Sequence, residues 1–261
     1  VGTGDDVLLV GFVTAGGSPL RLLGRGVGPS LEQHGVSGVL TNPSMALHEG
    51  PTRIDGNDDW GDVSDTQLAV EEMGRVGAFD LLPGSPDSLV LTQLAPRAYT
   101  AVISGVDGAE GIVLGEVYDR TPAVEVHPYT RLTNLSTRGR VGAGDDVLIG
   151  GFVITGSVPK QLLIRGVGPG LISYGVSGTL ADPFVRVLRD GVTLAQNDDW
   201  AFSDQAEYVM AASARAAAFA LDPQSKDAAL VVTLAPGSYT VILSGADGGT
   251  GVGLVEVYDL E

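Results

Sequence analysis

The stretch that decides the fold is RLTNLSTRGRVGAGDDV, residues 131–147. Its last seven residues repeat the first seven residues of the chain with a single difference. When residues 1–119 are laid over residues 141–259, roughly 50 positions are identical and no gap is needed. The chain is therefore a tandem duplication. Its 261 residues predict two domains, each long enough to bury its own core.

Within each copy, apolar residues occur in short runs closed by Gly, Pro, Asn or Asp. Runs of this length, separated by turn signals, predict an all-β fold of antiparallel sandwiches. The strands predicted in the first copy, each with an equivalent in the second, are Val7–Val13, Leu20–Leu23, Ser88–Leu94, Tyr99–Ser104 and Ile112–Tyr118.

One segment of each copy departs from the strand pattern. Residues 205–221 are rich in Ala and follow the capping pair Ser203-Asp204, so they predict a short helix that ends before Pro223. The counterpart, residues 65–79, contains Gly74 and Gly77, and we expect it to be shorter or frayed.

The region between the copies predicts the domain boundaries. Residues 120–130 have the composition of an extended linker, and Arg131–Thr137 alternates like a first strand of the second copy. The predicted domains are therefore 1–119 and 131–261, joined by 120–130. The first copy has no equivalent of this strand, so its sheet has an unpaired edge or borrows a strand, and that edge is a candidate contact surface.

Composition excludes several classes of function. The formal charge of −17 argues against nucleic acid and anionic membrane as partners, since both are bound through basic patches. The chain has no cysteine, which excludes thiol catalysis, disulfides and thiolate metal sites. No apolar run is long enough for membrane insertion. Because Val1 follows no signal peptide, we expect a mature or excised fragment of a longer protein.

The most pointed motif is Asn-Asp-Asp-Trp, which occurs once in each copy. Adjacent carboxylates and an amide are the oxygen ligands that calcium prefers, so calcium is the predicted cofactor. The alternative is that these side chains cap a turn, and the spacing, which differs from that of known calcium loops, favours it. Gly4-Asp5-Asp6 and Gly144-Asp145-Asp146 allow the same two interpretations. The candidate calcium ligands are Asn57, Asp58, Asp59, Asn197, Asp198 and Asp199.

Trp60 and Trp200 are the two tryptophans of the chain and occupy equivalent positions. An exposed indole beside carboxylates would stack on a sugar ring. A buried indole would anchor its loop to the core, and the low aromatic content of 6% favours this second interpretation.

The remaining polar motifs favour structure over chemistry. Arg25 and Arg165 stand in Arg-Gly-Val-Gly-Pro, which lacks the Gly-Lys-Ser/Thr ending of a phosphate loop, so we expect each Arg to pair with a carboxylate of its own domain. Asp107-Gly108 and its counterpart predict a turn. The three histidines, His34, His48 and His127, have no equivalents in the second copy, and no nucleophile elbow is present, so no catalytic residue is predicted.

The closing part of each copy supports a resemblance to known proteins. Residues 234–241, LAPGSYTV, followed by 244–251, SGADGGTG, and 256–259, EVYD, resemble the last strands of the bacterial pre-peptidase C-terminal type of β-sandwich. The whole unit from Arg131 to Asp259 is similar to a tandem repeat of large exported bacterial proteins. This resemblance implies a jelly-roll-like extracellular module that sometimes binds calcium. The first copy departs from the pattern at Arg97-Ala98 and Glu110.

Together these features predict a non-enzymatic structural or adhesive repeat of a secreted or cell-surface protein. Its expected partners are neighbouring copies or modules of the same protein. The second hypothesis is a carbohydrate-binding accessory module of a secreted hydrolase, with a glycan as partner. An enzyme with two facing carboxylates is a third interpretation.

Overall fold

The computed structural model describes residues 1–2, 6–122 and 130–261. The chain is mostly β-strand, with antiparallel sheets and few helices, so the predicted all-β sandwich class is confirmed. It divides into two compact units, Val1–Thr133 (the first unit) and Asn134–Glu261 (the second unit). Most of the predicted linker lies outside the described residues, as do His127 and the Gly4-Asp5 part of the first Gly-Asp-Asp motif.

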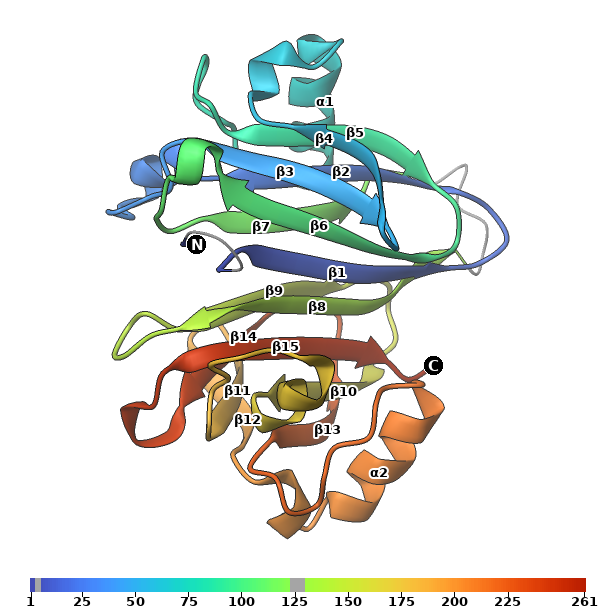
Figure 1. Cartoon of the computed structure of the whole chain (residues 1–261). Coiled ribbons are helices and arrows are strands. Elements are labelled where there is room, and N and C mark those ends of the chain that lie inside the picture. The colour runs from blue at the N-terminus through green and yellow to red at the C-terminus, as the bar shows by residue number, and fades with distance from the viewer. Residues whose placement is uncertain (3–5, 123–129) are drawn as a thin grey trace. The chain divides into compact units, whose positions relative to one another are not determined.

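The first unit contains two sheets (Figure 1). One sheet has the order β1-β6-β3-β4 and the other the order β5-β2-β7, with every neighbouring pair antiparallel. The strands are β1 (Leu8–Ala15), β2 (Leu20–Val27), β3 (Pro43–Glu49), β4 (Thr52–Asn57), β5 (Ser88–Leu94), β6 (Ala98–Gly105) and β7 (Leu114–Asp119).

The second unit repeats this arrangement and adds one strand. One sheet has the order β9-β14-β11-β12, and the other has the order β13-β10-β15-β8, so β8 lies beside β15. The strands are β8 (Arg131–Val141), β9 (Leu148–Ile154), β10 (Lys160–Val167), β11 (Pro183–Arg189), β12 (Val192–Asn197), β13 (Ala228–Leu234), β14 (Gly237–Gly245) and β15 (Gly251–Asp259).

The strand β2 of the first unit and its counterpart β10 of the second are each buried on both faces. On one face, β2 and β5 contact β3 of the other sheet. On the other face, Leu23 and Leu89 pack against Ala69 and Met73 of the helix α1 (Thr66–Val76). This double burial explains why seven of the eight residues of β2, including Arg25, are buried.

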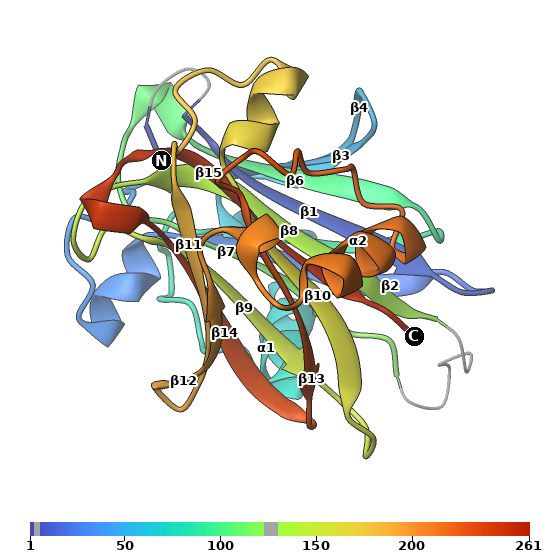
Figure 2. The same ribbon diagram turned by 90° about the horizontal axis from the view of Figure 1, so that it is seen from below.

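The second unit has the same helix layer. Its helix α2 (Ala206–Arg215) lies against β13 and β10 (Figure 2). Val209 and Ala212 of α2 join the core cluster that contains Leu163 of β10. Within the described residues, no helix is both long enough and apolar enough to cross a membrane.

The expected difference between the two helices is wrong. The helix of the first copy has 11 residues and that of the second has 10. The Asp65 carboxylate accepts a hydrogen bond from the Leu68 amide and caps the start of α1, and Gly77 ends it with a left-handed φ of 75°. The α2 prediction ran too far because Ala217 takes a left-handed φ of 51° well before Leu221.

Most predicted strands are confirmed, and several are longer than expected. Ser88–Leu94 coincides with β5, and the strand predicted at Arg131–Thr137 continues to Val141 as β8. Four strands were not predicted: β3, β4 and their counterparts β11 and β12. Asp107-Gly108 forms a turn with φ values of 52° and 75°, as predicted, but this turn joins β6 of one sheet to β7 of the other and closes no hairpin.

Candidate functional site

Each Asn-Asp-Asp-Trp motif lies where a sheet-edge strand gives way to the helix layer. Asn57 is the last residue of β4, and Trp60 opens a short 3₁₀ turn that leads to α1. Asn197 and Trp200 have the same positions at the end of β12 and before α2. The two motifs therefore hold equivalent places in the two units.

The asparagine of the motif binds backbone of the neighbouring strand. Asn57 Oδ1 accepts a hydrogen bond from the Leu89 amide at 3.0 Å, and its Nδ2 donates to the Asp59 carbonyl at 2.8 Å. In the second unit, Asn197 Oδ1 accepts from the Ala229 amide at 2.9 Å. Both amides therefore hold the turn against the start of the next strand of the other sheet, which supports the turn interpretation of the motif.

The aspartates of the motif face outward. Asp58 and Asp198 are exposed, and Asp59 and Asp199 are half-buried. In the described ranges, no group of three or more His, Cys, Asp or Glu side chains is arranged to hold a metal ion. Calcium at these residues, with Asn57 and Asn197 as further ligands, stays a prediction that the experiment below tests.

A lysine enters the electrostatics of the second motif. Lys226 forms an ion pair with Asp182. Hydrogen bonding to Asp182 raises the pKa of Lys226 above its ordinary value, and Asp199 and Asp198 add smaller contributions of the same sign. The first copy has Pro86 at the equivalent position. A cation bound at Asp198 and Asp199 would therefore meet a positive charge that the first motif does not have.

Both tryptophans belong to the core. Trp60 is 8% exposed and Trp200 is 3% exposed, and each is part of the apolar cluster beneath its helix. The Trp60 indole nitrogen donates to the Leu82 carbonyl at 3.1 Å. The core interpretation is therefore confirmed. Sugar stacking needs an open ring face, which neither indole has in this conformation.

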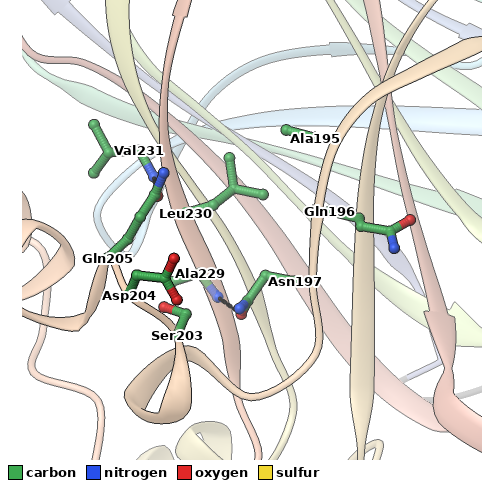
Figure 3. Close-up of a pocket in the computed structure, with 9 residues that line it drawn as sticks. All are labelled: Ala195, Gln196, Asn197, Ser203, Asp204, Gln205, Ala229, Leu230 and Val231. Atoms are coloured by element: carbon green, nitrogen blue, oxygen red, sulfur yellow. Dashed lines mark hydrogen bonds between the residues drawn. The ribbon is translucent and has the colours of Figure 1, made fainter.

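Beside the second motif lies a small open pocket of about 240 Å³ (Figure 3). The Asp204 carboxylate stands beside Ser203 at its rim, and Gln205 Oε1 accepts a hydrogen bond from the Val231 amide at 2.9 Å. The other lining residues are Ala195, Gln196, Asn197, Ala229 and Leu230.

The chemistry of this pocket is that of hydrogen bonding. Asp204 is its one ionisable side chain, and the second unit contains no histidine. General acid–base hydrolysis uses a base positioned against a nucleophile or two facing carboxylates, and the lining supplies neither pair. The equivalents of Gln196 and Ser203 in the first copy are Gly56 and Val63, whereas Asn197 is matched by Asn57, so the polar lining is only partly shared by the two copies.

The predicted role of the repeated arginines is confirmed. Arg25 is fully buried between β2 and the helix layer, where it forms an ion pair with Glu116 and donates to the Phe79 carbonyl at 2.6 Å. Arg165 repeats this with Glu256 at 2.5 Å and with the Phe219 carbonyl at 2.6 Å.

A tyrosine completes each of these buried networks. The hydroxyl of Tyr118 donates to Glu116 Oε1 at 2.6 Å, and the hydroxyl of Tyr258 donates to Glu256 Oε1 at the same distance. Burial raises the pKa of both tyrosine hydroxyls well above the ordinary value, and the neighbouring carboxylate raises it further. Glu-Val-Tyr-Asp closes both copies at 116–119 and 256–259, but no role was predicted for its Glu or Tyr.

One buried carboxylate in each unit was missed altogether. Asp87 is fully buried, and its Oδ1 accepts the Gly28 amide at 2.8 Å, ahead of a 3₁₀ helix that begins at Pro29. Asp227 repeats this with the Gly168 amide at 2.8 Å. The signal available in the sequence was the presence of an aspartate at the same place in both copies.

The two glycines at these turns touch a second loop closely. A Cβ added to Gly28 would lie 1.9 Å from the Leu40 carbonyl oxygen. At Gly168 the corresponding distance to the Leu180 carbonyl oxygen is 2.0 Å. The turn after β2 or β10, the buried aspartate and this second loop therefore form one locked junction in each unit.

Comparison with known proteins adds no family. No protein-family model matches the chain, and a search of curated proteins finds no match. Among solved structures, the infectious bursal disease virus VP2 subviral particle aligns over 100% of this chain and 70% of its own, with 10% identity and a TM-score of 0.18. A score this low carries no argument about this protein.

Proposed function

We propose that the chain is a pair of tandem jelly-roll-like sandwich domains, each with one short helix, that serves as a non-enzymatic structural or adhesive repeat of a secreted or cell-surface bacterial protein. Neighbouring copies or modules of the same protein are its proposed partners. The strand orders β1-β6-β3-β4 and β5-β2-β7 recur as β9-β14-β11-β12 and β13-β10-β15, which supports the tandem arrangement.

One observation carries the proposal. The fully buried polar side chains that both copies share, the arginine of β2 or β10 and the aspartate at the turn, are used inside the fold, as are the glutamate and tyrosine that contact the arginine network. Duplicated binding or catalytic sites would instead share polar side chains that point into a cavity. Of the polar side chains that line the second unit's pocket, by contrast, only Asn197 is identical in the first copy.

A hydrolysis screen tests the non-enzymatic part. The chain is incubated with panels of glycoside, peptide and ester substrates beside an Asp204→Asn variant, which keeps the shape of the pocket and removes its carboxylate charge. We expect no turnover above the buffer blank. Turnover by the chain that Asp204→Asn abolishes would overturn the proposal.

We further propose that calcium stabilises the repeat through the exposed Asn-Asp-Asp loops. Ligand binding to the folded state raises the melting temperature by mass action. Melting is measured in EDTA and then in millimolar calcium for the chain and for Asp198→Ala and Asp199→Ala. Asp190→Asn, in an exposed turn at the far end of β12, is the matched control. A calcium shift that survives Asp58→Ala, Asp59→Ala, Asp198→Ala and Asp199→Ala combined in one chain would place the ion elsewhere.

The pocket favours a second candidate, a carbohydrate-binding accessory module of a secreted hydrolase. Amide and carboxylate groups beside small apolar side chains are groups that hydrogen-bond sugar hydroxyls. A glycan array of the chain is compared with Gln196→Ala and Asp204→Ala in the pocket, and with Trp200→Phe, which keeps the core filled. Loss of a glycan signal in the pocket variants alone would establish the pocket. Loss in Trp200→Phe alone would assign the signal to the indole.

A further inference from the structure

The two equivalent strands β7 and β15 differ in how they are flanked. In the second unit, β15 pairs with β10 on one side and with β8 on the other. Among the described residues of the first unit, β7 pairs with β2 and ends its sheet. The last four residues of the two strands are identical in sequence, so the difference lies in the partner and not in the strand.

One residue already pairs with the outer edge of β7 near its start. The Val1 amino group donates to the Gly111 carbonyl at 2.8 Å, and the Gly111 amide donates to the Val1 carbonyl at 3.0 Å. In the second unit, Val141 at the end of β8 pairs with Gly251. Val1 and Gly111 are the residues that match Val141 and Gly251. Val1 therefore occupies, beside β7, the position that the last residue of β8 occupies beside β15.

The rest of this edge follows from strand alternation. Because every second residue of a strand directs its N–H and C=O to the same side, Val113, Gly115 and Val117 face the same edge as Gly111. Their counterparts Gly253, Val255 and Val257 pair with Gly139, Thr137 and Leu135 of β8. These three counterparts are buried, whereas Val113, Gly115 and Val117 are only half-buried.

We propose that this edge of β7 binds an antiparallel β-strand with the chemistry of β8, in the register that Val1 begins. Addition of a strand to a free edge supplies main-chain hydrogen bonds, and the side chains that alternate along it provide specificity. The charge fits: residues 131–141 contain three Arg and no acidic residue, while residues 1–119 contain 17 acidic and 5 basic residues. Glu110 and Asp119 flank the two ends of the edge and are exposed. The inference rests on the register of the two edges, not on the proposed function.

The test is a graft in the full chain. Residues 131–140 are copied ahead of Val1, so that Val1 follows them as Val141 follows the originals. Hydrogen exchange is then measured at Val113, Gly115 and Val117, with Gly253, Val255 and Val257 of the same molecule as paired references. We expect exchange at the first three amides to slow by at least about tenfold and to approach that of the references.

A second graft controls for nonspecific coverage. It carries Leu135→Pro and Thr137→Pro in the copied segment only, which removes two donors that would face β7. This graft is expected to leave Val113, Gly115 and Val117 exchanging as in the original chain. Equal protection by both grafts, or by neither, would overturn the proposal. Protection in the ungrafted chain that disappears on dilution would also overturn it, by assigning the edge to a second copy.

Discussion

Replacement of Arg165 by methionine tests how the buried network of the second unit is held. The guanidinium is fully buried, with Nε 2.7 Å and Nη2 2.5 Å from Glu256 Oε2, and it lies 4.1 Å from the centre of the Phe219 ring. Methionine keeps most of the volume and removes the charge. The Glu256 carboxylate, 8% exposed, would be left without its cation. Breaking a buried pair in this way costs about 3–5 kcal/mol of unfolding free energy.

The double variant Arg165→Met/Glu256→Leu separates the charge from the packing. Removing both partners leaves no buried charge, and the remaining loss comes from the Phe219 carbonyl and the Tyr258 hydroxyl, about 1–3 kcal/mol for each unsatisfied group. Because apolar replacement of an ion pair often recovers free energy, we expect the double variant to be more stable than Arg165→Met.

Urea unfolding followed by tryptophan fluorescence measures both effects. Each unit contains one tryptophan, so a Trp60→Phe background makes Trp200 the reporter of the second unit. The unfolding free energies of two variants are compared only where the slope of free energy against urea concentration is the same for both. A change in that slope would mean a change in the unfolded or folded ensemble. A loss below about 1 kcal/mol for Arg165→Met, or a double variant less stable than the single one, would refute the reasoning.

Left-handed backbone positions respond in opposite ways to glycine and alanine, because only glycine adopts a left-handed φ without cost. Gly77→Ala should lower the unfolding free energy by about 1 kcal/mol, and Ala217→Gly should leave it unchanged or raise it by up to about 1 kcal/mol. Urea midpoints measure both changes, and a lower midpoint for Ala217→Gly would contradict the prediction. Asp227→Ala should cost about 2–3 kcal/mol by leaving buried amides unpaired, whereas an unchanged melting curve would show that water replaces the carboxylate. Burial and then the Glu256 carboxylate raise the pKa of Tyr258. As the pH passes about 10, this tyrosine therefore ionises only in the unfolded state, and the unfolding free energy falls. Urea midpoints at about pH 8 and pH 11 should differ less in Tyr258→Phe than in the original chain, and an equal difference would contradict the prediction.

The sheet that carries β2 could be predicted from sequence more fully than the other. Leu22 and Leu23 in β2 and Leu89, Val90 and Leu91 in β5 are consecutive apolar residues, which mark both strands in the sequence. The strands β3 and β4 were missed because each is buried on one face at most. Only Met45 and Leu47 alternate clearly in β3, and a proline opens it. The same two residues were the signal that could have found the strand.

The helix layer shows where local propensity was overruled. The run of alanines after Ser213 favours helix, yet the Ala218 amide bonds back to the Ser213 carbonyl and the chain turns at Ala217. In the first unit, Gly77 lies at the helix end and not inside it. The prediction treated Gly77 as a weak point inside the helix and so expected a shorter helix. At this position the glycine ends the helix and does not weaken it.

The candidate site was predictable in its location but not in its partners. The Asn-Asp-Asp-Trp motif marks the same junction in both units. The bonds from Asn57 and Asn197 to the next strand join residues 32 positions apart, which no local pattern reveals. The Arg25 pair was predicted as a type of interaction, whereas its partner Glu116 lies 91 positions away and follows only from the pairing of β2 with β7.

The locked junction at Gly28 and Gly168 has a consequence for how this protein tolerates mutation. At both glycines the obstacle to a side chain is the carbonyl oxygen of the facing loop. In a saturation library selected for folded chains, every replacement at these two codons should vanish. Gly38 has a left-handed φ and open space around it, so asparagine should persist there. The two copies can drift at their surfaces while these two codons stay fixed.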